Sequence, residues 1–161
     1  MVCLHQFPVE SGLINFEPSE EALAMDTYQT WVRLFELQRY YSWIVDRFHL
    51  STEAYRLKTL GKEYDFGWLE DRFKNLGFQL VLCTRAPHSF KSAREERLRI
   101  LGKPSQYDDL KPFIMEQETM RETVKASKLP SLVVDITDNN IAKATEHIAD
   151  WMEETGGLWM N

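Results

Sequence analysis

The apolar residues of this chain follow two patterns: short continuous runs, and spacings of three and four positions. Residues 78–84 contain a continuous apolar core at 80–83, which is typical of a strand covered on both faces. Tyr28, Trp31, Val32 and Phe35 instead recur three and four positions apart, which predicts the buried face of a helix. The predicted strands are residues 1–5, 13–16, 43–45, 78–84 and 131–137.

Helical periods, capping residues and helix-ending glycines separate these runs. An alternation of strands and helices predicts a three-layer α/β/α fold with a mainly parallel sheet. The length of 161 residues favours a single domain over residues 1–161. The predicted helices are residues 19–40, 51–61, 65–77, 89–101, 108–126 and 139–154. The predicted sheet core is Val45, Leu80, Val81, Leu82, Val133 and Val134.

A charged pair, Asp46 and Arg47, follows the apolar run 43–45. Ser51 is predicted to cap the next helix, and Tyr55 shares a helix face with it. Ligands bind beyond the carboxyl ends of strands in open α/β sheets, so we expect the chemistry of this chain at the charged pair. The alternative is a structural salt bridge at the edge of a sheet.

The stretch from Asp46 to Tyr55 reads DR-x-x-x-S-x-x-A-Y and resembles the acceptor-site motif of thymidylate kinases, which are P-loop nucleotide kinases. The resemblance implies a P-loop-kinase-like fold that transfers phosphate from ATP to a deoxynucleoside monophosphate with Mg²⁺. It also implies that Arg47 holds the phosphate of the acceptor nucleotide, and that Asp46 places the acceptor or the metal. Phe48 and Tyr55 become candidates for contact with the base or sugar, and Ser51 also faces the ligand.

Lys91, Arg94 and Arg97 form one ridge of a predicted basic helix. In the resembled family, arginines of a mobile lid clamp the transferring phosphates, which implies a lid over about residues 86–107 and catalytic roles for Arg94 and Arg97. The alternative is a solvated helix face, since acidic residues interleave with the basic ones. Arg85 ends the strongest predicted strand and is expected close to the substrate.

The phosphate-binding loop of P-loop kinases has no counterpart in this sequence. That loop needs closely spaced glycines and a lysine. Here the first lysine is Lys58, and Gly12 is the only glycine before Gly61, so the loop and its following helix are both expected to be missing. Three hypotheses stay open: a kinase that holds ATP in another way, a non-catalytic nucleotide-binding or interaction module, and a truncated product of an active kinase gene.

Composition adds the remaining expectations. A net charge of −6 argues against non-specific nucleic-acid binding, and there is no apolar run long enough to span a membrane. The absence of a basic, apolar leader favours a cytoplasmic protein. Cys3 and Cys83 lack metal-ligand spacing. Because a missing first helix would expose strand edges and apolar faces, we expect a homo-oligomer with contacts near residues 1–16.

Overall fold

The computed structural model describes residues 20–38, 41–61, 64–101 and 109–156, with the side chains of 55–60 and 101 left out. The helices are α1 (Glu21–Leu37), α2 (His49–Leu60), α3 (Gly67–Asn75), the 3₁₀ turn η2 (Pro87–Ser89), α4 (Phe90–Leu101), α5 (Lys111–Ala126) and α6 (Ile141–Glu154). The strands are β1 (Leu80–Thr84) and β2 (Ser131–Asp135).

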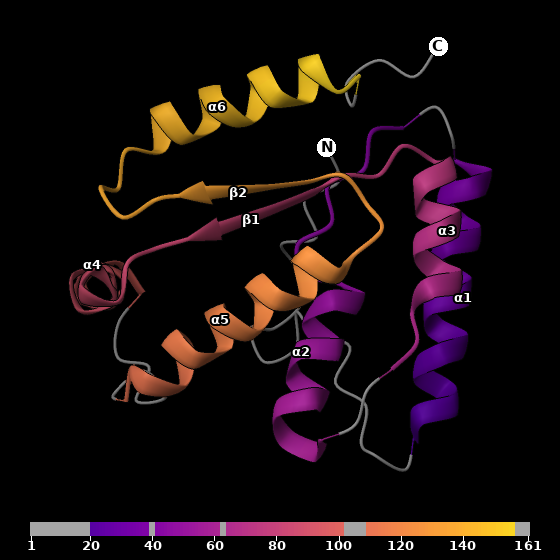
Figure 1. Cartoon of the computed structure of the whole chain (residues 1–161), viewed down its shortest axis with the longest axis horizontal. Helices are drawn as coiled ribbons and strands as arrows, with labels where there is room; N and C mark the ends of the chain where they lie inside the picture. The colour runs from indigo at the N-terminus through magenta and orange to yellow at the C-terminus, as the bar shows by residue number, and fades with distance from the viewer. Residues whose placement is uncertain (1–19, 39–40, 62–63, 102–108, 157–161) are drawn as a thin grey trace.

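The two strands pair in parallel, in register from Leu80 opposite Ser131 to Thr84 opposite Asp135. The connection between them carries α4 and α5, as a parallel pair requires. Figure 1 shows α6 on one side of this sheet and α5 on the other. The prediction of a mixed α/β fold with parallel strands is therefore confirmed, and within the described residues the sheet has two strands.

The predicted strand at residues 43–45 is wrong. These residues form an extended connection between α1 and α2 without strand pairing, and the side chain of Ile44 is 95% exposed. Trp43 alone of the three packs inward, with its ring 5.1 Å from that of Phe35. This one half-buried aromatic contact is enough to hold the connection, so its apolar run does not need a sheet. The predicted strands at 1–5 and 13–16 lie outside the described residues.

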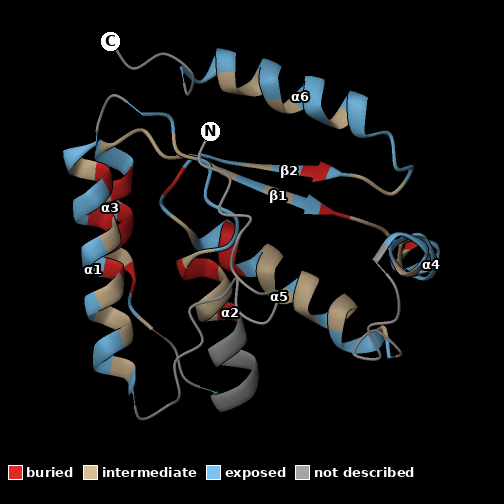
Figure 2. Ribbon diagram, turned by 180° about the vertical axis from the view of Figure 1, so that it is seen from behind, coloured by how far each residue is buried: buried red, intermediate tan, exposed pale blue. Residues whose placement is uncertain are grey.

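The main core is aromatic and lies between helices rather than on the sheet. Phe35 of α1, Phe73 of α3 and Phe78 before β1 pack together, with 4.5 Å between the ring centres of Phe73 and Phe78. The helical face predicted in α1 is confirmed, because Tyr28, Val32 and Phe35 are its buried residues. Figure 2 shows the buried residues concentrated on α1, α3 and the start of α2. The buried cluster is Tyr28, Val32, Phe35, Phe66, Leu69, Phe73 and Leu129.

The predicted sheet core is only partly correct. Val134 is buried, and Leu80 and Leu82 are half-buried. Val81 and Val133 are 40% and 43% exposed, and Val45 lies outside the sheet. Two strands present a narrow surface, and one helix on each side covers only part of it.

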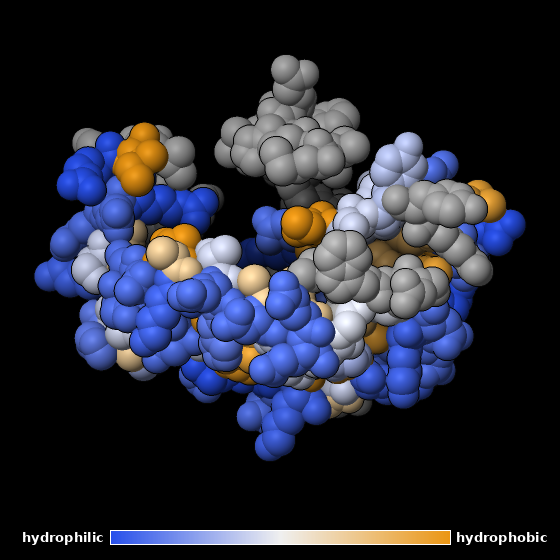
Figure 3. All heavy atoms as spheres, turned by 90° about the horizontal axis from the view of Figure 1, so that it is seen from above, coloured by the Kyte–Doolittle hydropathy of each residue, from blue (hydrophilic) through white to orange (hydrophobic). Residues whose placement is uncertain are grey.

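Helix α6 has nearly the predicted bounds but little burial, and the start of α2 differs from the prediction. None of the residues of α6 is fully buried. Figure 3 views the molecule from the side on which α6 lies in Figure 1, and this face is mainly hydrophilic. Helix α2 begins at His49, because the carbonyl of Phe48 accepts hydrogen bonds from the backbone N–H groups of Ser51 and Thr52. Ser51 therefore lies inside the first turn and is not the cap.

Among the described helices, none combines the length and the apolar character that a membrane span requires.

Candidate functional site

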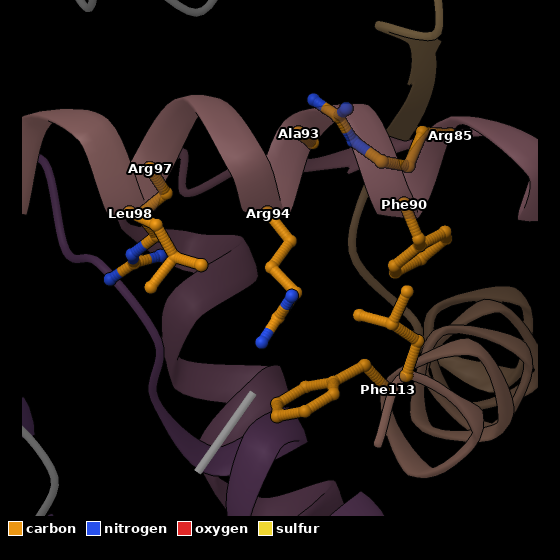
Figure 4. A pocket seen from close by; sticks show the side chains of 8 residues that line it. Arg85, Phe90, Ala93, Arg94, Arg97, Leu98 and Phe113 are labelled. Atoms are coloured by element: carbon orange, nitrogen blue, oxygen red, sulfur yellow. The ribbon is translucent and has the colours of Figure 1, made fainter. Parts of the chain in front are cut away.

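A groove at the carboxyl end of β1 collects three of the arginines that the sequence singled out. Arg85 follows β1, whereas Arg94 and Arg97 belong to α4. In Figure 4 the side chains of Arg94 and Arg97 extend from α4 toward the side on which Phe113 of α5 lies. The groove has a volume of about 330 Å³. Its apolar lining is Phe90, Ala93, Leu98, Leu110 and Phe113.

The backbone at the base of this groove is fixed by side chains from two other elements. Gln117 of α5 accepts a hydrogen bond from the N–H of Arg85 at 2.8 Å and donates one to its carbonyl at 2.9 Å. The N–H of Ala86 donates to Oγ1 of Thr137 at 2.7 Å. With its donors and acceptor satisfied in this way, the turn after β1 is a rigid support for the Arg85 side chain.

The Arg85 guanidinium is held at one nitrogen and unsatisfied at another. Nη2 donates to Oδ1 of Asn139 at 3.2 Å, whereas Nη1 is shielded from solvent without a hydrogen-bond partner. A shielded N–H of a cation is costly, and an anionic ligand would relieve the cost. Arg94 and Arg97 each take part in further interactions within the folded chain, so a ligand has to compete with these.

The charged pair lies elsewhere. Asp46 and Arg47 are both exposed, and the ring of Phe48 stacks on that of Phe73 at 5.7 Å, in the aromatic core that also holds Phe78. Phe78 precedes Arg85 by seven positions, which corresponds to roughly 20 Å of extended chain. The two groups of predicted site residues therefore lie toward opposite ends of β1.

The other predicted site residues are also apart from the groove. Ser51 is half-buried within α2, and the side chain of Tyr55 lies outside the described residues. Lys91 is exposed and does not line the groove, although the ridge of α4 that the sequence predicts includes it. Phe48 is a core residue whose ring also packs on Tyr28 at 4.9 Å, so little of its face is open to a base.

A buried polar cluster that the sequence interpretation missed lies at the amino end of α2. Nε2 of His49 is 3.2 Å from Oε1 of Glu70, which also accepts a hydrogen bond from Oγ of Ser127. Oε2 of Glu70 accepts from the backbone N–H of Lys128 at 2.9 Å. His49 and Ser127 are separated from Glu70 by 21 and 57 positions in the sequence, and no local motif predicts these contacts.

The electrostatics of this cluster favour an ionised carboxylate. Burial raises the pKa of Glu70, but the hydrogen bonds from His49, the Lys128 backbone and Ser127 outweigh it and lower the pKa to about 2. Ser127 bonds to Glu70 and not to an imidazole nitrogen, so the arrangement differs from a nucleophile activated by a base. The cluster joins α2, α3 and the segment between α5 and β2. We therefore assign it a structural role, in which it stabilises the fold.

The part of the chain that the structure describes has no group of residues that fits an ATP–Mg²⁺ site. The sequence has no glycine-rich loop to cradle the phosphates, and no described group of three His, Cys, Asp or Glu residues could hold a metal ion. Asp135, at the carboxyl end of β2, uses its Oδ1 to accept hydrogen bonds from the hydroxyl and N–H of Thr137. These bonds lower the pKa of Asp135 and tie its carboxylate to the turn.

No protein family model matches the chain, and neither a curated protein nor a solved structure does.

Proposed function

We propose that the protein binds a small phosphorylated ligand in the groove formed by Arg85, Arg94 and Arg97. The observation that carries the proposal is that these three arginines line one groove at the carboxyl end of a parallel strand, with the guanidinium groups of Arg94 and Arg97 extending toward Phe113. Ligand sites in open α/β sheets occur at such strand ends. Guanidinium groups bind phosphate oxygens through pairs of charge-assisted hydrogen bonds.

The distribution of charge around α4 supports an anionic ligand. The acidic residues of this helix, Glu95 and Glu96, do not line the arginine groove. They lie together with Ser92 and Arg99 on a separate, open surface of the helix. The groove is therefore a basic surface on a chain whose net charge is −6, and a phosphate would be attracted to it selectively.

The apolar lining favours a ligand that carries a flat organic group beside its phosphate. Phe90 and Phe113 supply aromatic rings, and Leu98 and Leu110 supply aliphatic surface. A volume of about 330 Å³ is at the small end of ligand pockets, which span about 300–1,000 Å³. A nucleoside monophosphate combines the required phosphate with a flat ring at about this size, and we use thymidine monophosphate as the probe.

Binding without phosphoryl transfer is the function that we propose. The kinase activity that the resemblance implies stays a prediction, because the chain lacks the loop that would hold the phosphates of ATP. No step through ATP or Mg²⁺ is proposed for this groove. Incubation with ATP, Mg²⁺ and thymidine monophosphate should give no ADP above the rate without protein, whereas sustained turnover would favour the kinase hypothesis.

Calorimetry with matched variants of α4 tests the binding site. Arg94→Ala removes a guanidinium from the groove, and Arg99→Ala removes the same group from the other surface of the same helix. A hydrogen bond to a charged group contributes about 1.5–3 kcal/mol. Arg94→Ala should therefore weaken the binding of thymidine monophosphate by about tenfold or more. Arg99→Ala should change it less than about twofold.

Two further results would decide against the proposal. Thymidine, which lacks the phosphate, should bind much more weakly than its monophosphate if the arginines recognise phosphate. Equal affinity for the two compounds would contradict phosphate recognition. Equal losses of affinity in Arg94→Ala and Arg99→Ala would contradict the assignment of the groove.

A further inference from the structure

Asn139 connects the two elements that carry the groove arginines. Its Oδ1 accepts a hydrogen bond from Nη2 of Arg85 at 3.2 Å, and its Nδ2 donates one to Oε2 of Glu96 in α4 at 2.9 Å. An arginine has only donors and an ionised glutamate has only acceptors, so one orientation of the amide satisfies both partners. The side chain thus joins the turn after β1 to the middle of α4.

The backbone of Asn139 holds this amide in place. Its φ of 56° lies in the left-handed region, which asparagine tolerates better than most residues. Its N–H donates to the carbonyl of Ile136 at 3.1 Å, and its own carbonyl accepts from the N–H of Ile141 at 2.9 Å. Ile136 follows β2 and Ile141 begins α6, so the position of the amide is set by the turn that joins the sheet to α6.

Helix α4 has little buried surface of its own. Figure 1 places it beyond the carboxyl ends of both strands, and Figure 2 shows it largely exposed. At its amino end, Oγ of Ser89 donates to the carbonyl of Ala86 at 2.8 Å, which ties η2 to the turn after β1. A helix with few buried apolar contacts opens easily, so a polar contact at its middle has a large influence on its position.

We infer that Asn139 is a positioning residue that holds α4 and Arg85 at the separation in which the groove binds its anion. The inference rests on the proposed function only where it concerns ligand affinity. The mechanical part, that Asn139 restrains α4, stands on the hydrogen bonds alone. A ligand phosphate held in the groove that these residues line would be released more readily when this restraint is lost.

Two single variants and one double variant separate positioning from folding. Asn139→Gly removes both hydrogen bonds and accepts the left-handed backbone without strain. Asn139→Asp keeps an acceptor for Arg85 and places a carboxylate against Glu96. Adding Glu96→Gln to Asn139→Asp reverses the polarity of the pair, because the new amide can donate to the new carboxylate. The double variant should therefore rescue the single one.

Hydrogen exchange of the α4 backbone amides gives a readout that needs no ligand. We expect exchange in α4 to be about three- to tenfold faster in Asn139→Gly and in Asn139→Asp than in the unmodified protein. The double variant should return to within about twofold of the unmodified protein. Exchange in α1 and α3, which do not contact this bridge, should stay unchanged in all three and serves as the control for global stability.

The affinity for thymidine monophosphate, measured on the same proteins, completes the test. We expect it to fall by about three- to tenfold in the two single variants and to recover in the double variant. Unchanged exchange in α4, or faster exchange with unchanged affinity, would overturn the inference. If the unmodified protein binds no nucleotide while α4 exchange follows the expected pattern, the proposed function fails and the restraint of α4 by Asn139 is supported.

Discussion

Nε2 of His49 lies 3.2 Å from Oε1 of Glu70, and both side chains are almost fully withdrawn from solvent. His49 begins α2 and Glu70 belongs to α3, so the contact joins the first turns of two helices. Through Ser127 and Lys128 the same carboxylate also holds the segment between α5 and β2. A single ionised group therefore links the helical core to the sheet.

The stability of the protein should fall at acid pH because of Glu70. Its pKa is about 2 in the folded protein and about 4.5 in an unfolded chain. A lowered pKa stabilises the fold above the unfolded value, and this contribution is lost as the pH falls from about 5 to about 2. This lowering of the pKa corresponds to at most about 3–4 kcal/mol of stability. Urea unfolding measured at steps between pH 6 and pH 3 should show a progressive decrease.

Replacing the carboxylate should remove most of this pH dependence. Glu70→Gln leaves a neutral amide among donors selected for an anion, and we expect a loss of about 2–3 kcal/mol at pH 7. Glu36→Gln is the matched control, because Glu36 is paired with Arg72 at 2.8 Å near the surface. Surface ion pairs contribute less than about 1 kcal/mol. A larger effect in Glu36→Gln than in Glu70→Gln would contradict the central role of the buried cluster.

The core between the helices should be the most sensitive to truncation. Phe35 is 2% exposed and contacts the rings of Phe73 and Phe78, so Phe35→Ala should cost about 3–5 kcal/mol in the free energy of unfolding. Ile44→Ala lies in the run for which the sequence predicts a strand, but Ile44 is 95% exposed. Its cost should stay within about 0.5 kcal/mol. A cost above about 2 kcal/mol would indicate that Ile44 is buried, as the predicted strand requires.

The sequence predicts helices well in this chain because their signals are local. Spacing alone identifies the buried face of α1, and a short apolar run identifies β1. The apolar run at 43–45 has the pattern of a strand, because an apolar sequence does not show which part of the protein packs against it. Trp43 finds its partner in Phe35, and Ile44 finds none within the described residues.

The candidate site shows the same division between local and distant information. The sequence predicts Arg85 near the site from its place at a strand end, and it predicts Arg94 and Arg97 from a helix ridge and from the lid of the resembled family. These three arginines line one groove, whereas Lys91 of the same ridge does not. The separation of this groove from Asp46 and Arg47 depends on where α2 packs, which is decided by contacts such as that between Phe48 and Phe73. Contacts of this kind form between residues far apart in the sequence, and local spacing does not predict them.

Arg47 provides the sharpest choice between the two locations of the ligand. The acceptor-site interpretation places the phosphate on Arg47, and removal of its guanidinium should then weaken the binding of thymidine monophosphate by about tenfold. The groove interpretation predicts a change of less than about twofold, because Arg47 is exposed and does not line the groove.

The backbone of Arg47 determines how this test is made. Its φ is 58°, so Arg47→Gly removes the charge in a conformation that glycine adopts freely, and Arg47→Ala removes the charge but keeps the strain. Calorimetry on both variants beside Arg94→Ala separates an effect of charge from an effect of folding. If both Arg47 variants lose affinity and Arg94→Ala does not, the ligand binds at the acceptor motif. This outcome would contradict the assignment of the groove.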